Sequence, residues 1–185
     1  MRPLDLLDVT AREHRALHRA LDLCVDDEQP AALEHITAVT LDLLRHEAME
    51  RVVLYPLLER DDGGPVAVLE RREEQRSIAS LVARSVEPPA ETDVVVVLRE
   101  LRMAVIGHTD REELEDFPRV RRCTSVEELR ALGKHRRAIA RRLAEVTLLP
   151  GELSIPENGD GPIGRLERVA LDILQSAEPT ATRQR

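Results

Sequence analysis

The chain has 185 residues, of which 42% are hydrophobic, 34% charged and only 1% aromatic, and this length allows one domain with a sizeable core. So few aromatic side chains argue against a β-rich core, and a net charge of −8 argues against a general nucleic-acid-binding protein. The beginning of the chain lacks the apolar run of a secretion signal, and no apolar stretch is long enough to span a bilayer. We therefore expect a cytoplasmic protein that binds neither nucleic acid nor membrane.

Four helical segments are predicted in the first 118 residues, because apolar side chains recur there every three to four positions. Breaks that contain Pro or Gly separate them. The segments cover approximately residues 3–24, 30–58, 65–86 and 91–118. Since the connections are short, neighbouring helices should run antiparallel. The fold predicted for residues 1–118 is therefore all-α, an up-down-up-down antiparallel four-helix bundle.

A C-terminal helical extension is predicted for residues 119–185. A very basic helix should begin after Ser125, a plausible N-cap to Glu128. The remaining parts are a loop at 150–162, a short amphipathic helix at 164–176 and a frayed tail at 178–185. This extension could cover the end of the bundle, join two copies in a homodimer, or dock a partner.

An internal repeat relates the two halves of the bundle. His46-Glu-Ala-Met-Glu50 is followed by Tyr55-Pro56, and His108-Thr-Asp-Arg-Glu112 is followed by Phe117-Pro118. In both halves Glu lies four residues after His, the aromatic residue nine after and Pro ten after. The only Tyr and the only Phe of the chain thus occupy equivalent places. The pattern indicates two helical hairpins of one design.

The repeat extends backwards to the first helix of each hairpin. Glu13-His14-Arg15 in the first half corresponds to Glu74-Gln75-Arg76 in the second. The spacing to the following histidine is 32 residues from His14 and 33 from Gln75. One difference matters chemically, because Gln75 stands where the first half has His14.

Polar residues of the repeat fall on the predicted core stripes, since positions i and i+4 share a helix face. They are His14, His46, Glu50, His108 and Glu112. An unpaired buried carboxylate costs several kcal/mol in desolvation, so the interior needs a compensating cation. Imidazole with carboxylate suits iron, manganese or zinc, and the stripes carry no Cys. The alternative is a buried His–Glu hydrogen-bond network without metal.

These motifs resemble the haemerythrin-like, or HHE cation-binding, domain over roughly residues 4–118. The resemblance implies a di-iron centre in which three histidines are nitrogen ligands and two glutamates bridge the metals. Carried over to this chain, they are His14, His46 and His108, with Glu50 and Glu112. The family expects a further His where this chain has Gln75, a weaker ligand. An asymmetric two-iron site, a single metal ion and a metal-free scaffold therefore all stay open.

Further residues are expected around this centre rather than in it. His18, Glu74 and Tyr55 are candidates for the surroundings of the metal ligands. Glu47 and Glu113 should project off the core stripe, whereas His35 should face solvent and His135 should lie in the basic helix, neither with a role at the centre.

Three functions are compatible with these residues. The first, implied by the resemblance, is a non-haem iron protein that binds or senses oxygen or iron, or handles peroxide or nitric oxide; its partners would be the metal ion and a small diatomic or peroxide ligand. The second is a metal-free helical interaction module, suggested by Gln75 and the basic extension. The third is an oxidase or peroxidase that uses the same site, because an open coordination position favours reactivity. The sequence does not decide between a carrier, a sensor and an enzyme.

Overall fold

The computed structural model describes residues 4–25, 31–88, 93–148, 152–153 and 161–177, and within these ranges it contains helices and no strand. The predicted all-α class is therefore confirmed. The tail at 178–185 and most of the loop at 150–162 lie outside the described residues.

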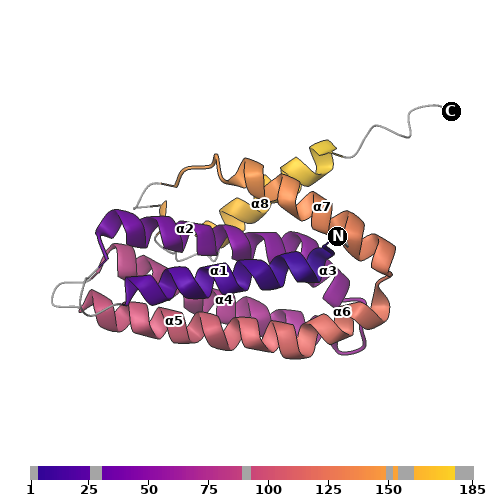
Figure 1. Ribbon diagram of the computed structural model, residues 1–185, viewed down its shortest axis with the longest axis horizontal. Helices are drawn as coiled ribbons and strands as arrows, with labels where there is room; N and C mark the ends of the chain where they lie inside the picture. The colour runs from indigo at the N-terminus through magenta and orange to yellow at the C-terminus, as the bar shows by residue number, and fades with distance from the viewer. Residues whose placement is uncertain (1–3, 26–30, 89–92, 149–151, 154–160, 178–185) are drawn as a thin grey trace.

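The helices follow the predicted segments closely (Figure 1). They are α1 (Leu6–Cys24), α2 (Leu33–Met49), α3 (Tyr55–Leu58), α4 (Gly64–Val86), α5 (Val94–Arg111), α6 (Phe117–Cys123), α7 (Val126–Leu143) and α8 (Pro162–Ala177). Two π-helical turns, η1 (Glu50–Leu54) and η2 (Glu112–Asp116), join α2 to α3 and α5 to α6. The fourth predicted segment continues beyond Pro118, and the π-helical turns were not predicted.

Side-chain caps explain where several helices begin. Asp5 forms a capping box with Asp8 at the start of α1, so two otherwise unpaired backbone N–H groups are satisfied. Asp93 accepts a hydrogen bond from the backbone of Val95 at the start of α5. The predicted cap of α7 is confirmed, because the Ser125 hydroxyl accepts from the backbone N–H of Glu128.

Two consecutive glycines make the tight turn between α3 and α4. Gly63 has a φ of 79°, in the left-handed region that favours glycine. A Cβ on Gly64 would lie 1.9 Å from the carbonyl oxygen of Leu58. The close return of the chain therefore depends on a glycine at each position.

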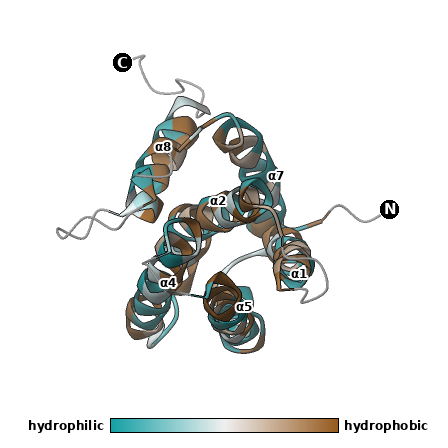
Figure 2. Cartoon of the chain, turned by 90° about the vertical axis from the view of Figure 1, so that its left-hand side faces the viewer, coloured by the Kyte–Doolittle hydropathy of each residue, from teal (hydrophilic) through white to brown (hydrophobic). Residues whose placement is uncertain are grey.

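The four long helices α1, α2, α4 and α5 lie side by side along the long axis of the molecule (Figure 1). Each contacts two of the others: α1 with α2, α2 with α4, α4 with α5, and α5 with α1. Figure 2 views this ring along the helix axes. Buried aliphatic side chains from all four helices fill its interior, among them Leu21, Leu43, Val82 and Leu101. The ring is consistent with the predicted four-helix bundle.

The C-terminal helices pack against one side of this ring. α7 contacts α1 and α2, and α8 contacts α2 and α7 (Figure 2). Leu129, Ile139 and Leu166 from these helices are buried and join the same hydrophobic core. The division into two parts at residue 118 stays a prediction. None of the described helices combines the length and the apolar character needed to cross a membrane.

Candidate metal centre

Six ionisable side chains meet inside the ring of long helices. Each is at most 3% exposed to solvent. They are His14 from α1, His46 and Glu47 from α2, Glu50 from η1, His108 from α5 and Glu112 from η2. The structure thus brings together the five predicted ligands and adds Glu47.

These side chains form two groups that could each hold a metal ion, and Glu50 belongs to both. In the first group, Glu50 Oε1 lies 2.8 Å from His46 Nε2 and 3.3 Å from His14 Nε2. In the second, His108 Nε2 lies 3.3 Å from Glu47 Oε2 and 3.7 Å from Glu50 Oε2. Because the two oxygens of Glu50 face different groups, this carboxylate can bridge two cations.

Glu112 also spans the two groups. Its Oε2 lies 3.4 Å from His14 Nε2, and its Oε1 lies 3.5 Å from His108 Nε2. The Tyr55 hydroxyl donates a hydrogen bond to Oε1 at 3.3 Å. Glu50 and Glu112 therefore occupy equivalent places in the repeat and equivalent places in the centre.

Several polar atoms of the cluster have no hydrogen-bond partner among the described residues. They are Nε2 of His46 and His108, both carboxylate oxygens of Glu47, and Oε2 of Glu50 and Glu112. Buried polar groups are normally satisfied, and a buried charge normally has a partner or a metal ion. When Nδ1 carries the only proton of each imidazole, the Nε2 atoms and the carboxylate oxygens that face them are acceptors without a donor. A cation between them removes that conflict, so the residues present fit a metal ion.

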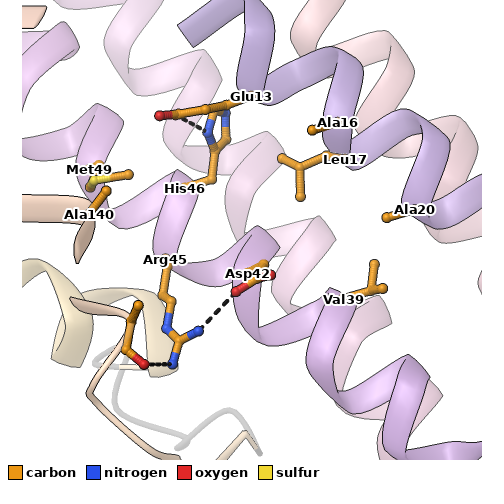
Figure 3. A pocket seen from close by; sticks show the side chains of 11 residues that line it. Glu13, Ala16, Leu17, Ala20, Val39, Asp42, Arg45, His46, Met49 and Ala140 are labelled. Carbon is orange, nitrogen blue, oxygen red and sulfur yellow. Dashed lines mark hydrogen bonds and ion pairs between the residues drawn. The ribbon is translucent and has the colours of Figure 1, made fainter. Parts of the chain in front are cut away.

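A second layer of carboxylates holds the outer nitrogen of each imidazole. Nδ1 of His14 lies 2.7 Å from Glu113 Oε1, and Nδ1 of His108 lies 2.8 Å from Glu74 Oε2. Nδ1 of His46 lies 3.0 Å from Glu13 Oε2 (Figure 3). An Nδ1–H that donates outward leaves the Nε2 lone pair directed into the cluster, as metal-binding histidines require.

The pKa values show how the cluster is balanced when protons take the place of a metal. Burial alone would lower the pKa of the His14 imidazole, but the surrounding carboxylates, Glu112 foremost, raise it to about 11. Burial and the charge of Glu50 raise the pKa of Glu112. Against the effect of burial, His46 and the other imidazoles hold the pKa of Glu50 well below its usual value. The cluster therefore attracts positive charge.

The family model of the hemerythrin HHE cation binding domain matches residues 5–120. The chain belongs to this family. The matched residues include all six members of the buried cluster, so the likeness and the geometry point to the same place. No curated protein and no solved structure matches the chain.

Gln75, the departure from the hemerythrin pattern, is engaged elsewhere. Its side chain is buried, its Oε1 accepts a hydrogen bond of 2.6 Å from Arg51, and its Nε2 donates to the backbone carbonyl of Glu47. Arg51 in turn pairs with Glu167 of α8. The amide oxygen, the side-chain atom of Gln75 that could bind a metal, therefore accepts a hydrogen bond from a guanidinium group instead.

Glu47 corrects one expectation from the sequence. The carboxylate does not project off the core stripe; it is fully buried and faces His108. Glu47 lies three residues before Glu50, and positions i and i+3 share a helix face as i and i+4 do. That spacing was the available signal. Glu47 thus adds a candidate ligand next to Gln75, where this hemerythrin-like chain lacks an imidazole.

The π-helical turns aim the end of each hairpin at the centre. The N–H of Tyr55 donates to the carbonyl of Glu50, and the N–H of Phe117 donates to that of Glu112. In a regular α-helix, residues five apart lie about 140° from each other around the axis, and the wider π turn reduces this angle. Tyr55 then reaches Glu112, and the Phe117 ring stacks on His14 with centroids 6.1 Å apart.

Other histidines stay outside the cluster. His18 is half-buried and its Nε2 lies 2.8 Å from the Thr109 hydroxyl. His35 is exposed, as expected, and His135 is exposed on α7. A cavity of about 370 Å³, lined mainly by apolar side chains, reaches Glu13 and His46 from the outer side (Figure 3).

Two buried arginines were missed by the sequence analysis. Arg71 is 2% exposed and its guanidinium contacts both Glu74 and Asp116. Arg136 of α7 is 0% exposed and contacts Glu13. Arginines are usually exposed, so the sequence carried no clear signal that Arg136 would be buried.

Proposed function

We propose that this chain is a hemerythrin-like non-haem iron protein whose long helices form an up-down-up-down bundle around two metal ions. His14, His46 and Glu50 would hold the first ion, and Glu47, His108 and Glu50 the second, with Glu112 available to both. The observation that carries the proposal is the convergence of buried nitrogen and oxygen atoms without donors on two positions that share one carboxylate. Nitrogen and oxygen donors of this kind suit iron.

Iron bound here would supply the capacity to bind dioxygen, nitric oxide or peroxide and to exchange electrons. The protein contributes the surroundings. The buried aliphatic core keeps water out, and the Tyr55 hydroxyl places a donor beside Glu112. The outer carboxylates Glu13, Glu74 and Glu113 fix the orientation of the imidazole rings. These features support reversible binding or sensing of a small diatomic or peroxide ligand. They are equally compatible with reduction of that ligand.

Iron content tests the proposal directly. Protein purified from iron-supplemented cells should contain about two iron atoms per chain, and a strong chelator should lower its melting temperature, since a ligand bound to the folded state stabilises it. His46→Ala should lose most of the iron. The matched control His35→Ala, on the same helix but exposed, should keep it.

An iron content near zero, with a melting temperature indifferent to chelator, would overturn the proposal and favour the metal-free interaction module. Peroxide turnover that vanishes in His46→Ala and persists in His35→Ala would identify the centre as an enzyme site. A homodimer through the C-terminal helices, one of the roles open to the extension, is tested separately by sedimentation of the full chain.

A further inference from the structure

Arg136 lies outside the residues matched to the family, yet it reaches the candidate centre. The side chain comes from α7 and is 0% exposed. Its Nε and Nη2 atoms donate to Glu13 Oε2 at 2.9 and 2.7 Å, and Nη2 lies 3.0 Å from His46 Nδ1. One guanidinium group thus contacts a ligand candidate and the carboxylate that orients it.

Comparison of the two hairpins shows that Arg136 takes the role in the first that Arg71 has in the second. In the second hairpin, Glu74 holds Nδ1 of His108 and is itself held by Arg71, three residues earlier on α4. In the first hairpin, Glu13 holds Nδ1 of His46, but three residues earlier stands Thr10.

Thr10 is buried and its hydroxyl donates to the carbonyl of Leu6, so it does not serve Glu13. The first hairpin therefore lacks an arginine of its own at this position. The guanidinium of Arg136, from a helix beyond the repeat, occupies the corresponding role.

We propose that α7 is an integral wall of the metal centre, and that Arg136 is a positioning residue that holds Glu13 on Nδ1 of His46. This inference rests on the proposed function. Without the guanidinium, the buried carboxylate of Glu13 would have one partner fewer and could turn toward solvent. His46 would then lose the hydrogen bond that directs its Nε2 toward Glu50.

The close docking of α7 on α1 keeps Arg136 in reach. A Cβ added to Gly133 would lie 2.8 Å from backbone atoms of Asp5 and Leu6, so only glycine allows this approach. Gly133 precedes Arg136 by three residues, and positions i and i+3 share a helix face. The contact surface of α7 therefore includes both the glycine and the arginine.

The experiment compares Arg136→Met, which keeps the length and removes the charge, with Arg136→Lys, which keeps the charge and loses the fork. Arg137→Met, at an exposed neighbouring position, is the matched control. Gly133→Ala moves α7 without touching the arginine. Circular dichroism verifies that each variant is folded. The two readouts are the ¹⁵N resonances of the His46 ring in metal-free protein and the rate at which a chelator removes iron from loaded protein.

We expect Arg136→Met to shift the His46 ring resonances. We also expect the chelator to remove iron about 10-fold to 100-fold faster, because losing a group that orients a metal ligand usually lowers metal affinity by that factor. Arg136→Lys should recover part of both effects, Gly133→Ala should resemble Arg136→Met, and Arg137→Met should match the wild type. Wild-type His46 resonances and iron retention in folded Arg136→Met overturn the inference. If the wild type binds no iron, the proposed function fails, and the resonances in the metal-free protein still decide whether Arg136 positions His46.

Discussion

At the scale of single residues, the centre combines an inner set of metal-ligand candidates with an outer set of carboxylates. Each of the three imidazoles donates outward to a glutamate from a different helix. Such hydrogen bonds fix the ring orientation and increase the basicity of the nitrogen that faces the metal. Glu50 belongs to both groups and Glu112 contacts a histidine of each, so the two positions should depend on each other.

The first prediction separates the roles of Glu47 and Gln75. Glu47→Gln should remove about one of the two metal ions, because the second group then loses a charged ligand. Gln75→Leu should retain both ions, since the amide oxygen of Gln75 is occupied by Arg51. Metal analysis of the purified variants, with the melting temperature as a control for folding, measures both. Metal loss in Gln75→Leu with full content in Glu47→Gln would make the amide the ligand instead.

At the scale of elements, the repeat of sequence becomes a repeat of structure. Each half contains a helix with a His–Glu pair, a π-helical turn that begins at the Glu, and a Pro directly after the aromatic residue. π-helical turns inside α-helices frequently mark functional sites. Proline lacks an N–H and its ring clashes with the carbonyl four residues earlier, so a wide turn before it relieves that clash. The proline after each aromatic residue therefore accounts for a π-helical turn in both halves of the bundle.

Periodicity and spacing were sufficient to predict the helical segments and five of the six ionisable side chains that meet inside. They were insufficient for the π turns, because a pattern with a regular period assumes one helix geometry throughout. They also failed for Arg136 and for the commitment of Gln75 to Arg51, because these contacts join helices that no repeat or spacing relates. The placement of Glu47 could have been predicted from its i, i+3 relation to Glu50.

The second prediction concerns the turn between α3 and α4. Gly64→Ala should lower the free energy of unfolding by about 2–3 kcal/mol, because the new methyl group would collide with the backbone of Leu58. Gly107→Ala is the matched control within α5, where the new methyl would meet only the flexible end of Arg111 at ordinary contact distance. This control should gain about 0.5–1 kcal/mol from the better helix propensity of alanine. Urea unfolding of metal-free protein gives both values. Equal changes in the free energy of unfolding for the two variants would contradict a steric requirement for glycine at position 64.

At the scale of the whole molecule, the C-terminal helices and the ring form one polar network as well as one apolar core. α7 contacts the first candidate group through Arg136 and Glu13, and α8 contacts the second through Glu167, Arg51 and Gln75. Substitutions in α7 or α8 should therefore alter the geometry of the centre. The net charge of the centre is the sum of its carboxylates, the buried arginines and the protonated imidazoles. This charge determines how strongly the centre attracts a metal ion.

The last prediction is that metal binding strengthens as pH rises. In metal-free protein the pKa of His14 is raised from 6.5 to about 11, so its protonated form stabilises the fold fully below pH 6.5 and this contribution is lost as pH approaches about 11. The pKa of Glu13 and that of Glu74 are lowered from 4.5 to about 2, against the effect of burial, by Arg136 and His108 respectively. Their contributions are present above pH 4.5 and are lost as pH falls toward 2.

A metal ion must displace the proton of His14, whereas Glu50, whose pKa is held well below 4.5 by the imidazoles against the effect of burial, is already ionised. The rise in melting temperature produced by Zn²⁺, a redox-silent probe, should therefore be larger at about pH 8 than at about pH 6. Binding should release protons, which calorimetry in buffers of different ionisation enthalpy detects. His135→Gln, which removes an exposed imidazole, should leave the pH dependence unchanged. A metal-induced stabilisation that is equal at both pH values would mean that the imidazoles of the cluster carry no proton for the metal to displace.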